Sequence, residues 1–175
     1  SGDQKTLSAS ATRSEMDASG IVWESSDTSV AAVNGSGVVT AKNPGTATIT
    51  CYGKNARGIR AACKVTVKLR QTTGVKLVSS AFNRIRISWE VVPGCNRYNI
   101  YRWDESGNSK KMATVTADVV TWQDTAVKTG STYTYRIRAS YVRSGKNTVY
   151  GAASPPLAAK AELGKARAVA EAVSG

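Results

Sequence analysis

The side chains that perform most enzyme chemistry are scarce in this chain of 175 residues. It contains no histidine, so neither a Ser-His-Asp triad nor a Cys-His pair can form. Its 12 acidic residues are scattered along the sequence and are not grouped as the paired carboxylates of a hydrolase. The sequence therefore predicts no catalytic residues and a protein that is not an enzyme.

Metal and cofactor ligands are equally sparse. The three cysteines, Cys51, Cys63 and Cys95, lack the close Cys/His spacing of a zinc site. Asp104 and Glu105 share the segment "DESGN", but a calcium site needs several carboxylates that converge on one loop. We interpret this segment as an ordinary turn, with a calcium loop as the alternative. No metal site and no cofactor are predicted.

The net charge of +12 is unevenly distributed. Residues 71–160 carry 13 basic and 5 acidic side chains, whereas residues 1–70 carry 9 and 5. A positive field of this kind attracts anionic surfaces without specifying which one. Nucleic acid, wall polymers, acidic glycans and lipid headgroups all fit this field, and so does a surface whose charge only keeps the protein in solution.

Short alternating segments dominate the secondary-structure pattern. In "TATITC", residues 46–51, apolar and polar side chains alternate, as they do in "RIRISWE", residues 84–90. Turn residues such as "PGCN" and "KTGS" interrupt the chain at spacings near ten residues, which is typical of stacked antiparallel sheets. No segment before residue 157 has a helical period. No run approaches the roughly 20 apolar residues of a membrane-spanning helix, and no signal segment is recognised.

Two of the cysteines lie on strands that are expected to form a hairpin. A regular hairpin between residues 46–51 and 63–68 places Cys51 opposite Cys63 and Ala47 opposite Val67. Directly opposed β-carbons lie roughly 4.5–5.5 Å apart, within reach of a disulfide. We predict a Cys51–Cys63 bridge that stabilises the fold by about 3 kcal/mol; two reduced core cysteines are the alternative. An oxidising compartment outside the cytoplasm follows if the bridge forms.

The first part of the chain resembles a known family. The stretches "IVWESSDTSVAAVNGSGVVTAKNPGTATITCYG" and "ACKVTV" are similar to the bacterial immunoglobulin-like domain, group 2. The resemblance spans residues 1–69 and implies a β-sandwich whose first strand is truncated here. It depends on Trp23, Ser25, Ser26, Asp27, Val30, Ala31, Val33, Gly37, Val39, Gly45, Thr46, Ala47 and Ile49.

The second part resembles the bacterial type of fibronectin type III domain. "ISWEVVPGCNRYNIYR", "VVTWQDTAV" and "GSTYTYRIRAS" match that family's motifs within residues 74–160. Trp122 and Cys95 stand where the family usually has tyrosine and alanine, and Tyr133 corresponds to the corner tyrosine, whose hydroxyl bonds nearby backbone. The predicted fold class is all-β, with two tandem immunoglobulin-like antiparallel β-sandwiches.

Residues 70–73 form the predicted linker between the two domains. Because the segment "KLRQTT" contains neither glycine nor proline, we expect limited bending there. The tail, residues 161–175, contains "LGKARAVAEAVSG", which aligns with "TGVKLVSSAFNR" at residues 73–84. This repetition predicts the first strand of a further fibronectin type III repeat. An alanine-rich helix is the alternative.

Four residues form the candidate binding face. Strand alternation places Tyr101 and Trp103 on the side opposite Tyr98 and Ile100, and hence outside. In the resembled fold their strand lies beside the strand of Arg136 and Arg138. One interpretation is a cation–π ladder that only covers the sheet, and the other is a surface that binds sugars or an anionic polymer. Trp23 and Trp89 are expected in the two cores.

The resemblance implies a non-catalytic module of a bacterial protein that is secreted or attached to the cell wall. We expect a monomeric spacer or stalk whose partners are the neighbouring domains of the same chain. The alternative is a binding module for a cell-wall polymer, a glycan or a host protein. Nucleic-acid binding and direct membrane insertion are not expected, because the chain has no recognition helix and no long apolar segment.

Overall fold

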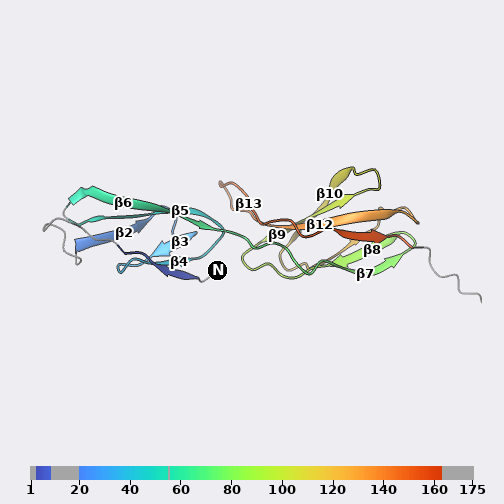
Figure 1. Ribbon diagram of the computed structural model, residues 1–175, viewed down its shortest axis with the longest axis horizontal. Coiled ribbons are helices and arrows are strands. Elements are labelled where there is room, and N and C mark those ends of the chain that lie inside the picture. Colours follow the sequence, from blue (N-terminus) through green and yellow to red (C-terminus); the bar gives the residue numbers. More distant parts are fainter. Residues whose placement is uncertain (1–2, 9–19, 55, 163–175) are drawn as a thin grey trace, which may run out of the picture. The chain divides into compact units, whose positions relative to one another are not determined.

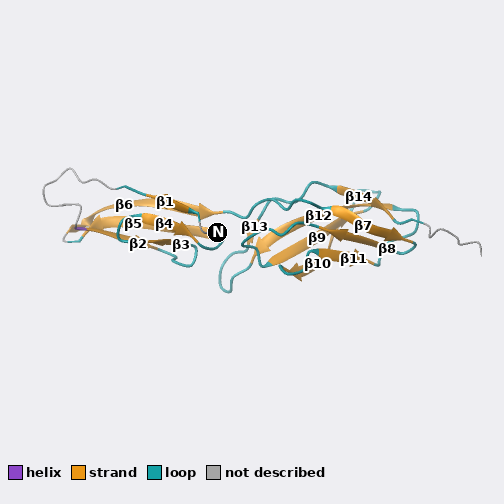
Figure 2. Ribbon diagram, turned by 90° about the horizontal axis from the view of Figure 1, so that it is seen from below, coloured by secondary structure: helices purple, strands orange, loops and turns teal. Residues whose placement is uncertain are grey.

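The computed structural model describes residues 3–8, 20–54 and 56–162 (Figure 1). The chain divides into two compact units: residues 1–71, 92–97 and 139–152 make up the first, and residues 72–91, 98–138 and 153–175 the second. The described residues form strands joined by loops (Figure 2), which confirms the all-β prediction and the tandem β-sandwiches. Residues 163–175, for which a strand or a helix was predicted, lie outside the described part.

Two three-stranded antiparallel sheets build the first sandwich. Their strand orders are β1-β4-β3 and β2-β5-β6. The buried core consists of Val30, Ala31, Val39, Ala47 and Ile49, against which Trp23 packs while remaining partly exposed. The strands are β1 (Gln4–Thr6), β2 (Ile21–Ser25), β3 (Ala31–Val33), β4 (Val38–Ala41), β5 (Gly45–Gly53) and β6 (Ala56–Val67).

Local side-chain chemistry ends these strands where the sequence predicts turns. Asp27 accepts hydrogen bonds from the backbone N–H and the hydroxyl of Ser29, and the side-chain oxygen of Asn34 accepts from the backbone N–H of Ser36 and Val38. Such bonds offer the backbone an alternative to the sheet ladder. On β5, Ala47 and Ile49 are each 1% exposed, as the alternation predicts. Fully burying a side chain such as Ile49 contributes about 1.5–3 kcal/mol.

The predicted register of the β5–β6 hairpin is wrong by two residues. Cys51 lies opposite Ala61 and Ile49 lies opposite Cys63, because the ladder shifts between Tyr52 and Gly53. An irregularity of this kind absorbs extra residues on one strand, and alternation of side chains cannot predict it. A two-residue shift keeps the same side chains on each face but makes Cys51 and Cys63 diagonal neighbours.

The predicted Cys51–Cys63 disulfide is therefore not formed. Diagonal neighbours lie about 7–8 Å apart, beyond the usual disulfide separation of about 4.4–6.8 Å between α-carbons. Both cysteines are free thiols, as is Cys95. Cys63 is exposed and Cys51 is half-buried.

The second sandwich packs a three-stranded sheet with order β11-β8-β7 against a sheet with order β10-β9-β12-β13, in which β14 also pairs with β12. β8 pairs antiparallel with β7 and β11, and β12 pairs antiparallel with β13 and β14. The strands are β7 (Lys76–Ala81), β8 (Arg84–Ser88), β9 (Arg97–Trp103), β10 (Ser109–Thr116), β11 (Thr121–Asp124), β12 (Thr132–Tyr141), β13 (Val149–Tyr150) and β14 (Leu157–Lys160).

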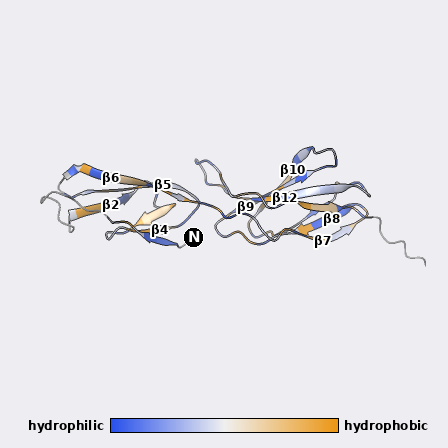
Figure 3. Cartoon of the chain, in the orientation of Figure 1, coloured by the Kyte–Doolittle hydropathy of each residue, from blue (hydrophilic) through white to orange (hydrophobic). Residues whose placement is uncertain are grey.

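The core of this sandwich is aromatic and β-branched. Along β8, hydrophilic and hydrophobic residues alternate (Figure 3), and Ile85 and Ile87 are fully buried. Trp89 is 4% exposed, as predicted, and meets Tyr98 edge-on with ring centroids 5.4 Å apart. The corner tyrosine is confirmed, since the backbone N–H of Lys128 donates to the Tyr133 hydroxyl at 2.9 Å. The side chains that fill this core are therefore those that the alternation along the strands places inward.

Gly37 is required at the turn before β4. Its φ is +77°, and an added Cβ would lie 2.6 Å from the Leu7 carbonyl oxygen and 3.0 Å from two ring carbons of Trp23. We predict that Gly37→Ala lowers the free energy of unfolding by about 2 kcal/mol or more, because both the positive φ and the contact become unfavourable. Urea unfolding followed by tryptophan fluorescence measures this loss.

Gly35→Ala is the matched control, because nothing lies within 4 Å of its added Cβ and its φ is not positive. We expect that variant to stay within about 0.5 kcal/mol of the parent. Equal stabilities of the two variants would contradict the role assigned to Gly37.

Candidate functional site

The four predicted face residues lie on two strands of one sheet, β9 and β12. The Arg136 guanidinium carbon lies 5.9 Å from the centre of the Trp103 ring, within cation–π range. The Tyr101 and Trp103 rings have centroids 6.4 Å apart and are inclined at 45°. The structure therefore brings Tyr101, Trp103 and Arg136 together on the side of the sheet that faces away from the core.

This face is less open to solvent than strand alternation alone suggests. Tyr101, Trp103 and Arg138 are half-buried, and Arg136 is exposed. Asn99, which the alternation places on the same side, is only 6% exposed. Its amide donates to the carbonyl of Arg138 at 3.3 Å and its side-chain oxygen accepts from the Thr114 hydroxyl at 3.1 Å. Side-chain bonds across β10, β9 and β12 thus hold the face in one arrangement.

The charge of this sheet has one sign. None of the strands β9, β10, β12, β13 and β14 contains Asp or Glu. They carry seven basic residues, namely Arg97, Arg102, Lys110, Lys111, Arg136, Arg138 and Lys160. The surplus positive charge of residues 71–160 is therefore strongly represented on one sheet, where it attracts anions.

Asp104 and Glu105 follow Trp103 in the turn between β9 and β10, and both carboxylates are engaged in local bonds. Asp104 accepts from the backbone N–H of Asn108 at 2.9 Å and from its side-chain amide at 3.2 Å, and these bonds hold the Asp104 pKa below its usual value. Glu105 accepts from the backbone N–H of Thr132 at 2.7 Å. The bonds between Asn108 and Asp104 are those of a turn, whereas the Glu105 bond joins the turn to the start of β12.

Sequence analysis missed a buried ion pair behind the face. Arg102 lies on β9 between Tyr101 and Trp103 and points into the core, where its guanidinium lies 2.8 Å from a carboxylate oxygen of Asp124. The Asp124 side chain is 1% exposed and that of Arg102 is 17% exposed. Asp124 belongs to β11, so the pair joins the two sheets. The only indication of this ion pair in the sequence is Asp124, which belongs to the motif "VVTWQDTAV" that resembles the fibronectin type III family.

The polar atoms around this pair are well satisfied. Asp124 also accepts from the Tyr135 hydroxyl at 2.9 Å and from the backbone N–H of Ala126 at 2.9 Å. Arg102 donates to the Ala126 carbonyl at 2.8 Å and lies 4.6 Å from the centre of the Tyr133 ring. A buried ion pair is tolerated when its remaining donors and acceptors are bonded in this way.

The network shifts the ionisation of two of its members. Burial, followed by the hydrogen bond to Asp124, raises the pKa of Tyr135 well above its usual value. Burial opposes the charge of Arg102, but the hydrogen bond and the charge of Asp124 prevail and raise the Arg102 pKa. At neutral pH the network therefore contains a neutral phenol and a fixed pair of opposite charges.

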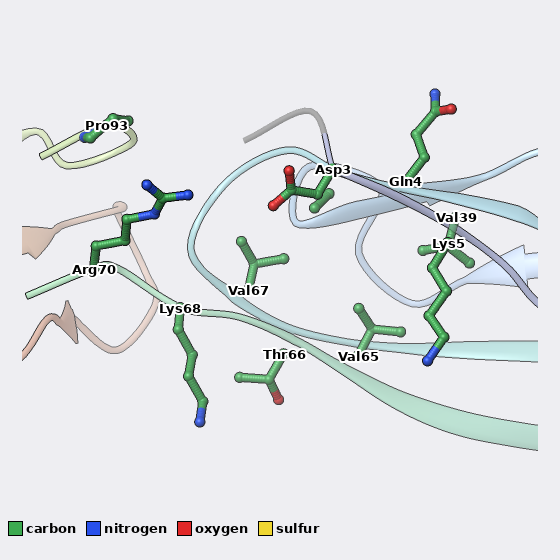
Figure 4. Close-up of a pocket in the computed structure, with 11 residues that line it drawn as sticks. Asp3, Gln4, Lys5, Val39, Val65, Thr66, Val67, Lys68, Arg70 and Pro93 are labelled. Atoms are coloured by element: carbon green, nitrogen blue, oxygen red, sulfur yellow. The ribbon is translucent and has the colours of Figure 1, made fainter.

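Two hollows in the first unit contain no comparable arrangement. An open hollow of about 510 Å³ beside β1, β4 and β6 (Figure 4) has a lining that mixes Asp3 with the cations Lys5, Lys68 and Arg70. A smaller apolar cleft of about 150 Å³ is lined in part by Cys51, Cys63 and Trp23. Neither lining pairs an acid with a base at a reacting position.

Within the described ranges, no group of three or more Cys, Asp or Glu side chains is placed to hold a metal ion. The same part of the chain contains no helix with the length and apolar character needed to cross a bilayer. The described arrangement with the most distinct chemistry is thus the aromatic and cationic face of β9 and β12.

Comparison with protein families agrees with the fold. The model of the bacterial Ig-like domain (group 2) matches residues 1–65. This part of the chain is therefore similar to group 2 bacterial Ig-like domains, and the sandwich of β7–β14 that follows it has a fibronectin type III-like fold. The comparison with curated proteins returned no match.

Solved structures similar to this chain include fibronectin type III domains. A two-domain segment of chicken tenascin aligns with a TM-score of 0.53 and 13% identity over 71% of this chain and 70% of that one. At such identity the likeness shows the fold alone. The sixth fibronectin type III domain of human fibronectin type III domain containing protein 3 aligns with a TM-score of 0.48 and 13% identity, over 61% of this chain and 97% of that one. A fibronectin type III domain of human collagen XX aligns with a TM-score of 0.44 and 18% identity, over 57% of this chain and 98% of that one.

The buried pair makes Asp124 a sensitive position. We predict that Asp124→Asn lowers the free energy of unfolding by about 3 kcal/mol, because the Arg102 charge then stays buried without its counter-charge. Chemical denaturation at neutral pH measures the change. The same substitution at the exposed Asp118 is the control and should have a much smaller effect. A stability of Asp124→Asn equal to that of the control would refute the structural role of the pair.

The raised pKa of Tyr135 predicts a loss of stability in alkali. In the unfolded chain this phenol ionises near pH 10, whereas in the folded state its pKa is raised. The folded state therefore retains a proton that the unfolded state has lost, and stability falls as the pH rises above about 10. We expect Tyr135→Phe to reduce the slope of unfolding free energy against pH by about 1.4 kcal/mol per pH unit in that window. An unchanged slope would show that Tyr135 ionises freely in the folded protein.

Proposed function

We propose that these two β-sandwiches are a non-catalytic module of a secreted or cell-surface bacterial protein, and that the module is a spacer presenting neighbouring domains. The observation that supports this proposal is the composition of the two cores. Each sandwich has its own closed core, and Arg102, Asp124 and Tyr135 inside the second core are joined by an ion pair and a hydrogen bond.

The class of fold is consistent with this role. Group 2 bacterial Ig-like domains and fibronectin type III folds are typical of modular extracellular proteins, in which independently folded domains follow one another along a chain. A domain with its own core keeps its structure beside different neighbours.

A spacer is defined by its size and not by its particular surface. We predict that a surface-anchored fusion with an epitope tag beyond residues 1–175 binds a bulky antibody, and that deleting this module lowers the binding several-fold because the tag then lies close to the cell surface. Flow cytometry measures the binding. A small tag-binding peptide monitors expression in every fusion.

The matched control replaces the module by an unrelated pair of fibronectin type III domains. We expect that replacement to restore antibody binding, because only the length of folded chain matters to a spacer. Restoration by the native module alone would contradict the proposal and would indicate a role that requires its particular surface.

A further inference from the structure

The outward face of β9 and β12 has a chemistry that a spacer does not require. We propose that this face, centred on Arg136 and Arg138 beside Tyr101 and Trp103, binds a polysaccharide that carries carboxylate groups along its chain. The inference is independent of the spacer function, because a module can hold its neighbours apart and also bind a polymer.

The first argument is that the Arg136 guanidinium is held in place before a ligand arrives. It lies over the Trp103 ring at 5.9 Å, and Trp103 is in turn packed beside Tyr101. A guanidinium in cation–π contact with a ring still has N–H groups that can pair with the two oxygens of a carboxylate. Holding the side chain in advance reduces the conformational entropy lost on binding.

The second argument is the spacing of the cations. Arg136 and Arg138 are two residues apart on one face of β12, so their backbone positions are separated by roughly 6.8 Å. Lys110 on β10 and Lys160 on β14 extend the basic surface on strands that contain no acid. A row of fixed cations matches an anion that repeats along a polymer better than a single small ion.

The third argument separates a polysaccharide from nucleic acid. Proteins that bind single-stranded nucleic acid stack successive bases on aromatic faces. Here Arg136 lies over the Trp103 ring, and the Tyr101 ring is inclined at 45° to it, so the two rings do not offer a row of open, parallel platforms. The described arrangement presents guanidinium groups to the ligand and uses the rings to position them.

The opposite sheet provides an internal control. Arg84 and Arg86 are also two residues apart on an exposed face, on the central strand β8. They have the same charge and spacing as Arg136 and Arg138, but among the described residues no aromatic ring lies within cation–π range of either, as Trp103 does of Arg136. A general positive field would use both pairs equally, whereas the proposed site uses only the pair on β12.

The experiment measures binding of the whole chain to immobilised oligogalacturonate by surface plasmon resonance at physiological salt. Its methyl ester, which lacks the charge, a sulfated dextran and a single-stranded oligonucleotide are tested in parallel. The variants are Arg136→Gln with Arg138→Gln, Arg84→Gln with Arg86→Gln, Trp103→Ala, and Arg136→Lys. Thermal melting establishes that each variant is folded, and Arg136→Lys remains a test if Trp103→Ala does not fold.

We expect saturable binding to oligogalacturonate and none to its methyl ester. The pair of changes on β12 should weaken binding about tenfold or more, since a hydrogen bond between charged groups is lost, and the pair on β8 less than about twofold. Trp103→Ala and Arg136→Lys should each weaken binding although the charge of the face is unchanged, because the guanidinium is no longer positioned.

Four results would overturn the inference. These are no binding to oligogalacturonate, equal losses from the two arginine pairs, full binding by Arg136→Lys, and equal or tighter binding to the oligonucleotide or to the sulfated dextran. None of them bears on the spacer proposal, which the antibody-access measurement tests separately.

Discussion

The second sandwich depends on the ion pair between Arg102 and Asp124, which joins β9 in one sheet to β11 in the other. A charge buried in a sheet-on-sheet core is unfavourable unless its partners surround it, and Tyr135, Ala126 and the Tyr133 ring do so here. The pair has a geometric consequence as well. Because side chains alternate along a strand, fixing Arg102 inward also fixes Tyr101 and Trp103 outward.

One strand therefore serves two purposes. The inward side of β9 contributes Tyr98, Ile100 and Arg102 to the core, and its outward side carries the aromatic residues that hold Arg136. The charge of the face arises from the absence of acids on five neighbouring strands. Stability and surface chemistry are thus linked through the backbone of a single strand, while the first sandwich keeps a purely aliphatic core of small β-formers with Trp23 at its margin.

This division of roles suits a module of a larger surface protein. The part of the chain that is similar to group 2 bacterial Ig-like domains, residues 1–65, contributes one sandwich, and the fibronectin type III-like fold of β7–β14 contributes a second sandwich with a chemically distinct sheet. Cys51, Cys63 and Cys95 are free thiols. Folding then rests on burial and turn geometry, for example the positive φ of Gly37, and the outer surfaces remain available for recognition.

The sequence by itself determined that Ala47 and Ile49 in "TATITC" and Ile85, Ile87 and Trp89 in "RIRISWE" face inward, because apolar and polar residues alternate there with the two-residue period of a strand. It also indicated the two families, the corner hydroxyl of Tyr133 and the neighbourhood of Tyr101, Trp103, Arg136 and Arg138. It did not determine the exposure of Cys63, which was expected in the core. Only the tertiary structure decided which residues contact one another across strands and between sheets. Cys51 lies opposite Ala61 and not Cys63 because an irregularity in the ladder sets the register, and periodicity cannot specify register. Arg102 meets Asp124 because the sheets stack, and such a contact between distant segments has no local signature.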